Sequence, residues 1–230
     1  ALGQLSVYEV LNLLAYSVVG AGFVFHARRL KATLEASDDL NDLSFVPPAV
    51  KTAWRLAAMG VPGAELCEIG HMPELEQIPR DTPRDIDVLF YGSLNPRRKR
   101  ILAALRKHGV RLKVLLGVYG AERDAWIARS KIVLNIHYYE AKVLEIVRLS
   151  YLLSNRRFVI SESGKDAELE APFSRGMVID NYRMLVPQCL TWLQNDDARN
   201  TIATAGHEIF ARRNQAEFLK PLILPSGSGQ

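Results

Sequence analysis

The sequence predicts an α/β protein with a parallel sheet covered by helices on both faces, preceded by a smaller, mainly helical amino-terminal region. Short apolar runs alternate with amphipathic segments from residue 86 to about 213. A polar, proline-bearing stretch at 79–85 separates this alternation from what precedes it. Strands that alternate with helices form βαβ units, which place the strands in parallel. We therefore divide the chain into residues 1–80, 86–215 and a tail at 216–230.

The first 80 residues carry mostly helical signals. Apolar residues recur at helical spacing in part of 5–19, and 26–36 is amphipathic. A proline pair precedes 49–60, which closes on a glycine, and this arrangement is typical of a helix start and end. A short strand is expected at 64–70. These elements predict a small helical region ahead of the sheet.

The second region supplies the sheet. Its near-continuous apolar runs are typical of strands buried on both faces. The predicted strands lie at 86–92, 110–118, 131–139, 156–163 and 176–181, and the predicted helices at 96–109, 121–130, 141–155, 183–194 and 196–213. Parallel sheets bind ligands beyond the carboxyl ends of their strands. The loops after Tyr91, Gly117, His137 and Ser161 are therefore expected along one edge.

Composition narrows the function classes. The 230 residues carry 29 Lys and Arg against 25 Asp and Glu, a mild net charge of +4 that gives no reason to expect a nucleic-acid partner. Cys67 and Cys189 have neither disulfide-framework nor zinc-finger spacing, so a reducing, cytoplasmic location is expected. The apolar run at 10–25 is short for a membrane span. Residues 5–30 remain a candidate contact with a membrane surface or a second copy.

An anion site is predicted where the first strand of the sheet meets its helix. Gly92 and Ser93 follow the strand, Asn95 precedes the helix, and four cations occupy 97–100. Backbone N–H groups and a helix N-terminus attract phosphate, and arginine adds charge-assisted contacts. Successive helical positions point in different directions, so at most two of the four cations reach one ligand. A solvated basic surface is the alternative interpretation.

A second candidate stretch follows the strand that ends near His137. Glu140, Lys142, Glu145 and Arg148 lie on the predicted loop and helix. Glu145 and Arg148 are three residues apart and can pair on one helix face. The neighbouring positions are strongly apolar, which indicates burial, and buried charges need partners or a ligand. The carboxylates could accept hydrogen bonds from sugar hydroxyls, and the cations could face phosphate.

Three aromatic or titratable residues near these stretches have weaker signals. His137 could act as an acid, a base or a phosphate donor, and a structural histidine is an equal alternative. Tyr138 could stack on a base, although packing is the simpler interpretation. His71 lies at a predicted strand end in the first region and could face a cleft. No HExxH, GxSxG or CxxC stretch is present, so we expect neither a metal nor a resident cofactor.

Residues 86–213 resemble the carboxyl-terminal, donor-binding domain of GT-B glycosyltransferases, with the closest resemblance to bacterial spore-maturation CgeB-like and family-4-like proteins. Three matches carry the resemblance: the strand and turn VLFYGSLNPRRKRIL, the run from Asn135 to Glu162, and the closing LQNDDARNTIATAGHEIF. The resemblance implies a Rossmann-like sheet. It also makes the first 80 residues a reduced or truncated acceptor-side part.

The resemblance further implies a function. A UDP- or GDP-sugar would bind with its diphosphate near Gly92 to Arg98 and its ribose near 140–148, and the sugar would pass to an unknown acceptor without a metal. The implied catalytic candidates are Glu145, His137 and Arg98. The implied donor-binding set is Gly92, Ser93, Asn95, Arg97, Arg98, Tyr138, Glu140, Lys142, Glu145 and Arg148.

Two alternatives to transfer stay open. One is a non-catalytic module that binds a nucleotide or a nucleotide sugar. The other is an assembly protein that docks through residues 1–45.

Overall fold

The structure is a computed structural model that describes residues 23–24, 65–139, 142–165 and 167–223. Gly70–Asn214 cluster as one compact unit, which we call the sheet unit. A second unit takes in Glu9–Ile69 and Gln215–Gln230. The predicted helices before residue 64, and most of the proposed contact segments at 5–30 and 1–45, lie outside the described residues.

The second unit contributes three described elements. Strands β1 (Phe23–Val24) and β2 (Glu65–Leu66) pair antiparallel, with Phe23 opposite Leu66. The strand expected at 64–70 is therefore only two residues long. Helix α10 (Gln215–Ile223) begins at the last residue of the predicted 86–215 domain and takes up the first part of the predicted tail at 216–230. Among the helices of the described residues, none combines the length and the apolar content needed to cross a bilayer.

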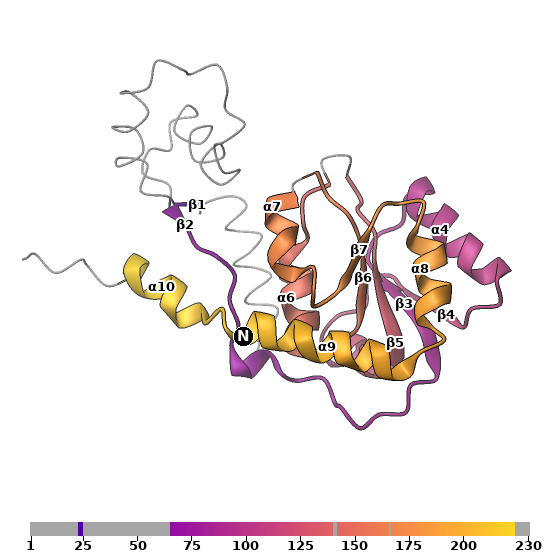
Figure 1. Ribbon diagram of the computed structural model, residues 1–230, viewed down its shortest axis with the longest axis horizontal. Helices are drawn as coiled ribbons and strands as arrows, with labels where there is room; N and C mark the ends of the chain where they lie inside the picture. The colour runs from indigo at the N-terminus through magenta and orange to yellow at the C-terminus, as the bar shows by residue number, and fades with distance from the viewer. Residues whose placement is uncertain (1–22, 25–64, 140–141, 166, 224–230) are drawn as a thin grey trace, which may run out of the picture. The chain divides into compact units, whose positions relative to one another are not determined.

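The sheet unit confirms the predicted parallel α/β architecture. Its strands are β3 (Ile86–Tyr91), β4 (Leu112–Leu115), β5 (Ser130–Asn135), β6 (Val159–Glu162) and β7 (Val178–Asp180). They form one parallel sheet in the order β4-β3-β5-β6-β7 (Figure 1). The order starts at β3, steps outward to β4, and then returns past β3 to β5. The carboxyl ends of all five strands consequently lie along one edge.

Helices cover both faces of the sheet. The main ones are α4 (Pro96–Lys107), α5 (Gly120–Ala128), α6 (Ile146–Ser154), α8 (Leu185–Trp192) and α9 (Asp196–Ala211), with short turns at η1 (Pro73–Leu75), α7 (Ala167–Glu170) and η2 (Ala171–Phe173). Leu105 of α4 and Leu185 of α8 share a core with Val88 and Phe90 of β3. Helix α6 lies on the opposite face, next to α9 (Figure 1).

Several strands and helices are shorter than predicted, and two of these differences shape the functional edge. Strand β5 ends at Asn135 instead of continuing to 139, because the next carbonyl, that of Ile136, accepts hydrogen bonds from the Arg98 guanidinium instead of from a neighbouring strand. Helix α6 begins at Ile146 instead of 141, and Lys142 has a left-handed φ of 48°. The described residues between β5 and α6 therefore form a loop at the sheet edge.

Candidate functional site

The site lies where the strand order reverses, between the carboxyl ends of β3 and β5. The helices that follow these two strands, α4 and α6, cover opposite faces of the sheet. In open α/β sheets such a reversal leaves a crevice in which ligands bind. The two loops meet here, because the Asn95 side-chain amide donates to the Tyr138 carbonyl over 3.0 Å. We call this edge the switch-point site.

Asn95 also fixes the start of helix α4. Its side-chain oxygen accepts a hydrogen bond from the backbone N–H of Arg98 at 2.8 Å, and Pro96 occupies the first helical position. This is a favourable N-cap, followed by a residue whose φ is already suited to the helix. The cap directs the partial positive charge of the α4 N-terminus toward the switch-point site.

Arg98 is buried beneath the two loops and holds them together. Its guanidinium donates to the Ser93 carbonyl at 2.8 Å and to the Ile136 carbonyl through Nε at 2.9 Å. A terminal nitrogen lies 3.3 Å from a carboxylate oxygen of Glu145. Burial lowers the pKa of Arg98, with the Glu145 charge opposing that shift. Arg98, which the sequence predicts to contact an anion, thus already donates to several acceptors of the protein. Its contact with a diphosphate stays a prediction.

Arg97 points along the sheet edge to a carboxylate that the sequence analysis did not single out. Both of its terminal nitrogens contact Glu162, the last residue of β6, whose side chain is 0% exposed. The Lys142 ammonium lies 3.2 Å from the same carboxylate, and the His137 backbone N–H donates to it at 3.1 Å. Burial raises the pKa of Glu162, but Arg97, Lys142 and this N–H together hold it below its usual value.

Glu145 and Arg148 form the pair that their spacing predicts, at 3.3 Å. Glu145 precedes the first residue of α6 instead of lying on the helix. Arg148 also donates to the Asn135 side-chain oxygen at 3.0 Å, and its guanidinium lies 4.7 Å from the centre of the Tyr91 ring. Arg148 therefore bridges the ends of β3 and β5, and Glu145 lies between it and Arg98.

His137 lies within the loop after β5, with 2% of its surface exposed. Its Nε2 is buried without a hydrogen-bond partner among the described residues. Burial lowers the pKa of His137, while the charges of Glu162 and Glu145 act in the opposite direction. A buried polar atom with no partner is uncommon in a native protein and marks a position where a ligand or a water can bind.

Gly92 makes the close approach of these side chains possible. Its φ is +125°, a backbone conformation that residues other than glycine rarely adopt. A Cβ at this position would lie 3.1 Å from Nη2 of Arg148 and 3.6 Å from Nη1 of Arg98. The bare backbone at Gly92 therefore admits both guanidinium groups to the end of β3.

The remaining predicted residues take different places. Tyr138 is partly exposed and lies 5.1 Å from the Arg98 guanidinium, whereas Lys99 and Arg100 face solvent. The four cations thus point in different directions, as expected for successive helical positions, and which of them reach a ligand stays a prediction. Glu140 lies outside the described residues. His71 is not part of this edge and contacts Glu76 instead.

Sequence reasoning missed three contributors to the site: Glu162, Asn135 and Tyr182. Tyr182 follows β7, contacts Arg97 face-on at 4.0 Å and donates its hydroxyl to the Arg97 carbonyl. One signal for Glu162 was available, because it is a single carboxylate that closes the apolar run of β6. Its partners are far away in the sequence, and no local spacing reveals them.

Charge is unbalanced at the switch-point site. Among the described residues, four cationic side chains, those of Arg97, Arg98, Lys142 and Arg148, pair with only two carboxylates, Glu145 and Glu162. A third carboxylate, that of Glu170, is near enough for its charge to act on His137, so the cations remain in excess by one. Such an excess at a partly dehydrated edge attracts anions.

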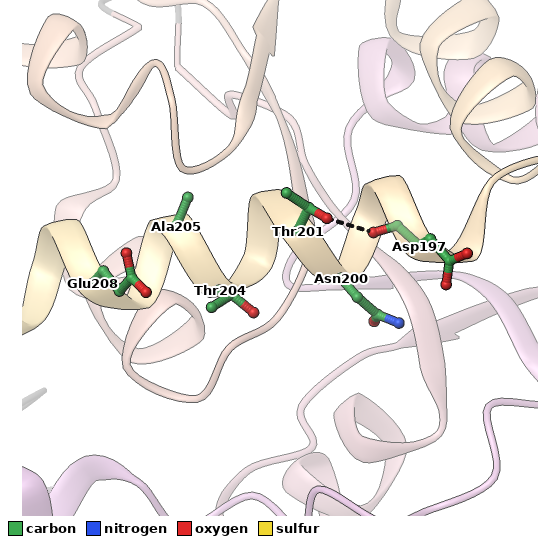
Figure 2. A pocket seen from close by; sticks show the side chains of 6 residues that line it. All are labelled: Asp197, Asn200, Thr201, Thr204, Ala205 and Glu208. Atoms are coloured by element: carbon green, nitrogen blue, oxygen red, sulfur yellow. Dashed lines mark hydrogen bonds between the residues drawn. The ribbon is translucent and has the colours of Figure 1, made fainter.

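A separate hollow lies on the outward face of α9 (Figure 2). Asp197, Asn200, Thr201, Thr204, Ala205 and Glu208 line it. All six side chains come from a single helix. The hollow therefore lacks the convergence of polar groups from several elements that the switch-point site shows.

No protein-family model matches the sequence. Three uncharacterized proteins of Acanthamoeba polyphaga mimivirus are similar to it. L138 is 30% identical over 126 residues, and the match covers 54% of this chain and 14% of L138. L137 is 31% identical over 53% of this chain and 17% of its own length. L140 is 29% identical over 53% of this chain and 41% of its own length. The chain thus matches only a part of each curated relative.

Two solved structures share the fold. TarM superposes with a TM-score of 0.53 at 12% identity, over 80% of this chain and 47% of TarM. The sucrose-phosphate synthase of Thermosynechococcus elongatus superposes with a TM-score of 0.51 at 13% identity, over 74% of this chain and 54% of that structure. These structural neighbours are GT-B glycosyltransferases. The chain therefore shares its Rossmann-like fold with a part of these enzymes. It spans about half the length of each neighbour.

Proposed function

We propose that the sheet unit binds a nucleotide-diphosphate sugar at the switch-point site and takes part in transferring the sugar to an acceptor. The observation that carries the proposal is the excess of cationic over carboxylate side chains at the strand-order reversal, in a fold shared with glycosyltransferases. A UDP- or GDP-sugar is the proposed donor, and relationship to the CgeB-like or family-4-like type is part of the same proposal.

The diphosphate would lie against Gly92 and the N-terminus of α4. Gly92 presents bare backbone there, and the capped helix adds partial positive charge. Lys142, in the loop after β5, and Arg148, in the first turn of α6, are the cations best suited to contact phosphate, because both are partly exposed. Arg97 is also partly exposed, but both of its terminal nitrogens already contact Glu162. Arg97 and Arg98 would contribute charge while they hold the loops in place.

Transfer would break the bond between the anomeric carbon and the diphosphate oxygen, and it would form a bond from that carbon to an acceptor oxygen. The surplus positive charge would stabilise the negative charge that develops on the departing diphosphate. Neutral His137 has an Nε2 atom available to take the acceptor proton or to bind a donor hydroxyl. Glu145 could accept a hydrogen bond from a ribose or sugar hydroxyl.

Donor hydrolysis tests this proposal. Many transferases release sugar slowly to water, so the full chain would be incubated with UDP- and GDP-sugars and the free diphosphate measured by chromatography. We expect release with at least one donor, with a loss in Lys142→Gln and full retention in Lys107→Gln. Lys107 is an exposed lysine at the far end of α4 and serves as the matched control. Absence of release with every donor would contradict catalysis.

Nucleotide binding without transfer is the second candidate. Arg98, an implied catalytic residue, already donates to Ser93, Ile136 and Glu145, so its role here is visibly structural. A binding module would show nucleotide-dependent thermal stabilisation with no release of diphosphate from any donor. Measuring both properties on one preparation separates the two functions.

A further inference from the structure

A second cluster of titratable side chains lies within the sheet unit, and the proposed transfer does not use it. His71 precedes the short turn η1, Glu76 follows that turn, and His207 lies on α9. The Nε2 atom of His71 is 3.2 Å from Oε1 of Glu76, and the Nε2 atom of His207 is 2.8 Å from the same oxygen. All three side chains are largely buried. Two imidazoles thus converge on a single carboxylate oxygen.

We propose that His71, Glu76 and His207 form a binding site for one divalent transition-metal ion, with zinc the best match. Their three ligand atoms lie within 4.8 Å of one another. Among the described residues, no other group of three His, Cys, Asp or Glu side chains brings its ligand atoms this close together. Zinc bonds of about 2.0–2.1 Å in a tetrahedron place ligand atoms roughly 3.3 Å apart. Two imidazole nitrogens and one carboxylate oxygen are zinc ligands, and a water would complete the tetrahedron.

The surroundings of Glu76 orient its carboxylate for this role. Arg156 and Arg80 contact the other oxygen, Oε2, at 3.0 and 2.5 Å, which leaves Oε1 directed at the two rings. Partners of this kind fix the orientation of metal-ligating carboxylates. The side chains of Arg80 and Arg156 are 55% and 31% exposed, so solvent screens their repulsion of an added cation.

The position of the cluster indicates what a bound ion would do. The His71 backbone N–H donates to the Arg213 carbonyl, and His71 pairs with Asn214 in an isolated parallel bridge. The ligands therefore come from the first residues of the sheet unit and from its last long helix. An ion would cross-link the beginning and the end of this unit. The ligands are 5 and 131 residues from Glu76, a spacing that resembles no local zinc motif.

Calorimetric titration of Zn²⁺ into the chelator-treated, tag-free full chain tests the site. We expect one ion per chain in the wild type. His71→Gln and His207→Gln should each weaken zinc binding by at least about tenfold, the scale on which metal sites respond to loss of supporting groups. His108→Gln is the matched control, because His108 is an exposed histidine that follows α4. It should bind zinc like the wild type.

Thermal unfolding provides the second readout. Zinc should raise the melting temperature of the wild type and of His108→Gln, and at the same zinc concentration it should raise that of His71→Gln and His207→Gln less. If one histidine variant fails to fold, the other decides. A folded wild-type protein that takes up no zinc would overturn the site. So would wild-type zinc affinity in the folded histidine variants, since the ion would then bind elsewhere.

Discussion

Arg97 donates hydrogen bonds to Glu162 from both terminal nitrogens of its guanidinium. The pair lies at the edge of the sheet that carries the carboxyl ends of its five strands. Glu162 is wholly buried, and Lys142 approaches it from the loop after β5. This carboxylate therefore ties helix α4, strand β6 and the loop together. The site's excess positive charge is arranged around it.

Glu162→Gln should destabilise the protein by about 3 kcal/mol, because removal of one partner of a buried ion pair leaves the other charges uncompensated. We take the lower end of the usual range because Arg97 and Lys142 are partly exposed and can turn toward water. Urea unfolding of wild type and variant measures the difference. Asp85→Asn is the control, since Asp85 pairs with Arg129 at the exposed surface; it should leave the urea midpoint unchanged, and an equal loss in both variants would contradict the account.

Acid should weaken the fold between pH about 4.5 and 2. Burial acts to raise the pKa of Glu76, but hydrogen bonds and charges of His207 and Arg156 outweigh it and lower the pKa to about 2. The pKa of Glu162 is also below its usual value. A carboxylate with a depressed folded-state pKa stabilises the fold above its unfolded pKa, and this contribution disappears as pH falls through the folded value.

Urea unfolding at pH 6, 4 and 3, in the presence of a chelator, measures this loss. The free energy of unfolding should decline steadily across the series in the wild type. Glu162→Gln should decline less, because its amide takes up no proton. A stability that stays flat down to pH 3 would show that these carboxylates are not held charged by the fold.

Gly92→Ala should cost roughly 1–3 kcal/mol, the range for a non-glycine residue forced into a sparsely populated backbone region. The new methyl would also crowd Arg148. Gly109→Ala is the matched control, because Gly109 likewise has a positive φ, of 73°, but nothing lies within 4 Å of its added Cβ. The Gly92 variant should lose more stability and also lose nucleotide affinity. Equal effects in the two variants would argue that no close approach exists at Gly92.

His137→Phe separates a ligand-binding histidine from a structural one. Phenylalanine keeps a ring and removes Nε2, a buried atom that has no partner among the described residues. Removal of an unsatisfied polar atom is near neutral or stabilising. Thermal unfolding should therefore change little, whereas affinity for a nucleotide sugar should fall. A large loss of stability with unchanged affinity would assign His137 a structural role.

The fold of the sheet unit could be predicted from the sequence because its strands are buried on both faces. Val88 and Phe90 face one layer of helices while Leu89 is equally buried, so the run 86–91 contains almost no polar residue. Such runs, spaced by amphipathic segments, leave few arrangements other than a parallel sheet. Strand ends were less predictable, since the end of β5 depends on the distant side chain of Arg98.

The candidate site was predicted only in part, because some of its contacts also join residues that lie far apart in the sequence. Gly92, Asn95 and the first cations of α4 are neighbours in the sequence, and local spacing reveals them. Glu162 is 65 residues from Arg97, and only the strand order brings the two together. The pair of Glu145 and Arg148 was found by helical spacing, although Glu145 lies just before the helix.

The most direct test of the switch-point site is calorimetric titration of UDP, GDP, ADP, dTDP and CDP into the wild type, Lys142→Gln and Lys107→Gln. We predict that at least one diphosphate binds the wild type and Lys107→Gln equally. The same diphosphate should bind Lys142→Gln more weakly, and added salt should weaken binding to all three. A folded wild-type protein that binds none of the five would contradict the central claim that this edge is a diphosphate site.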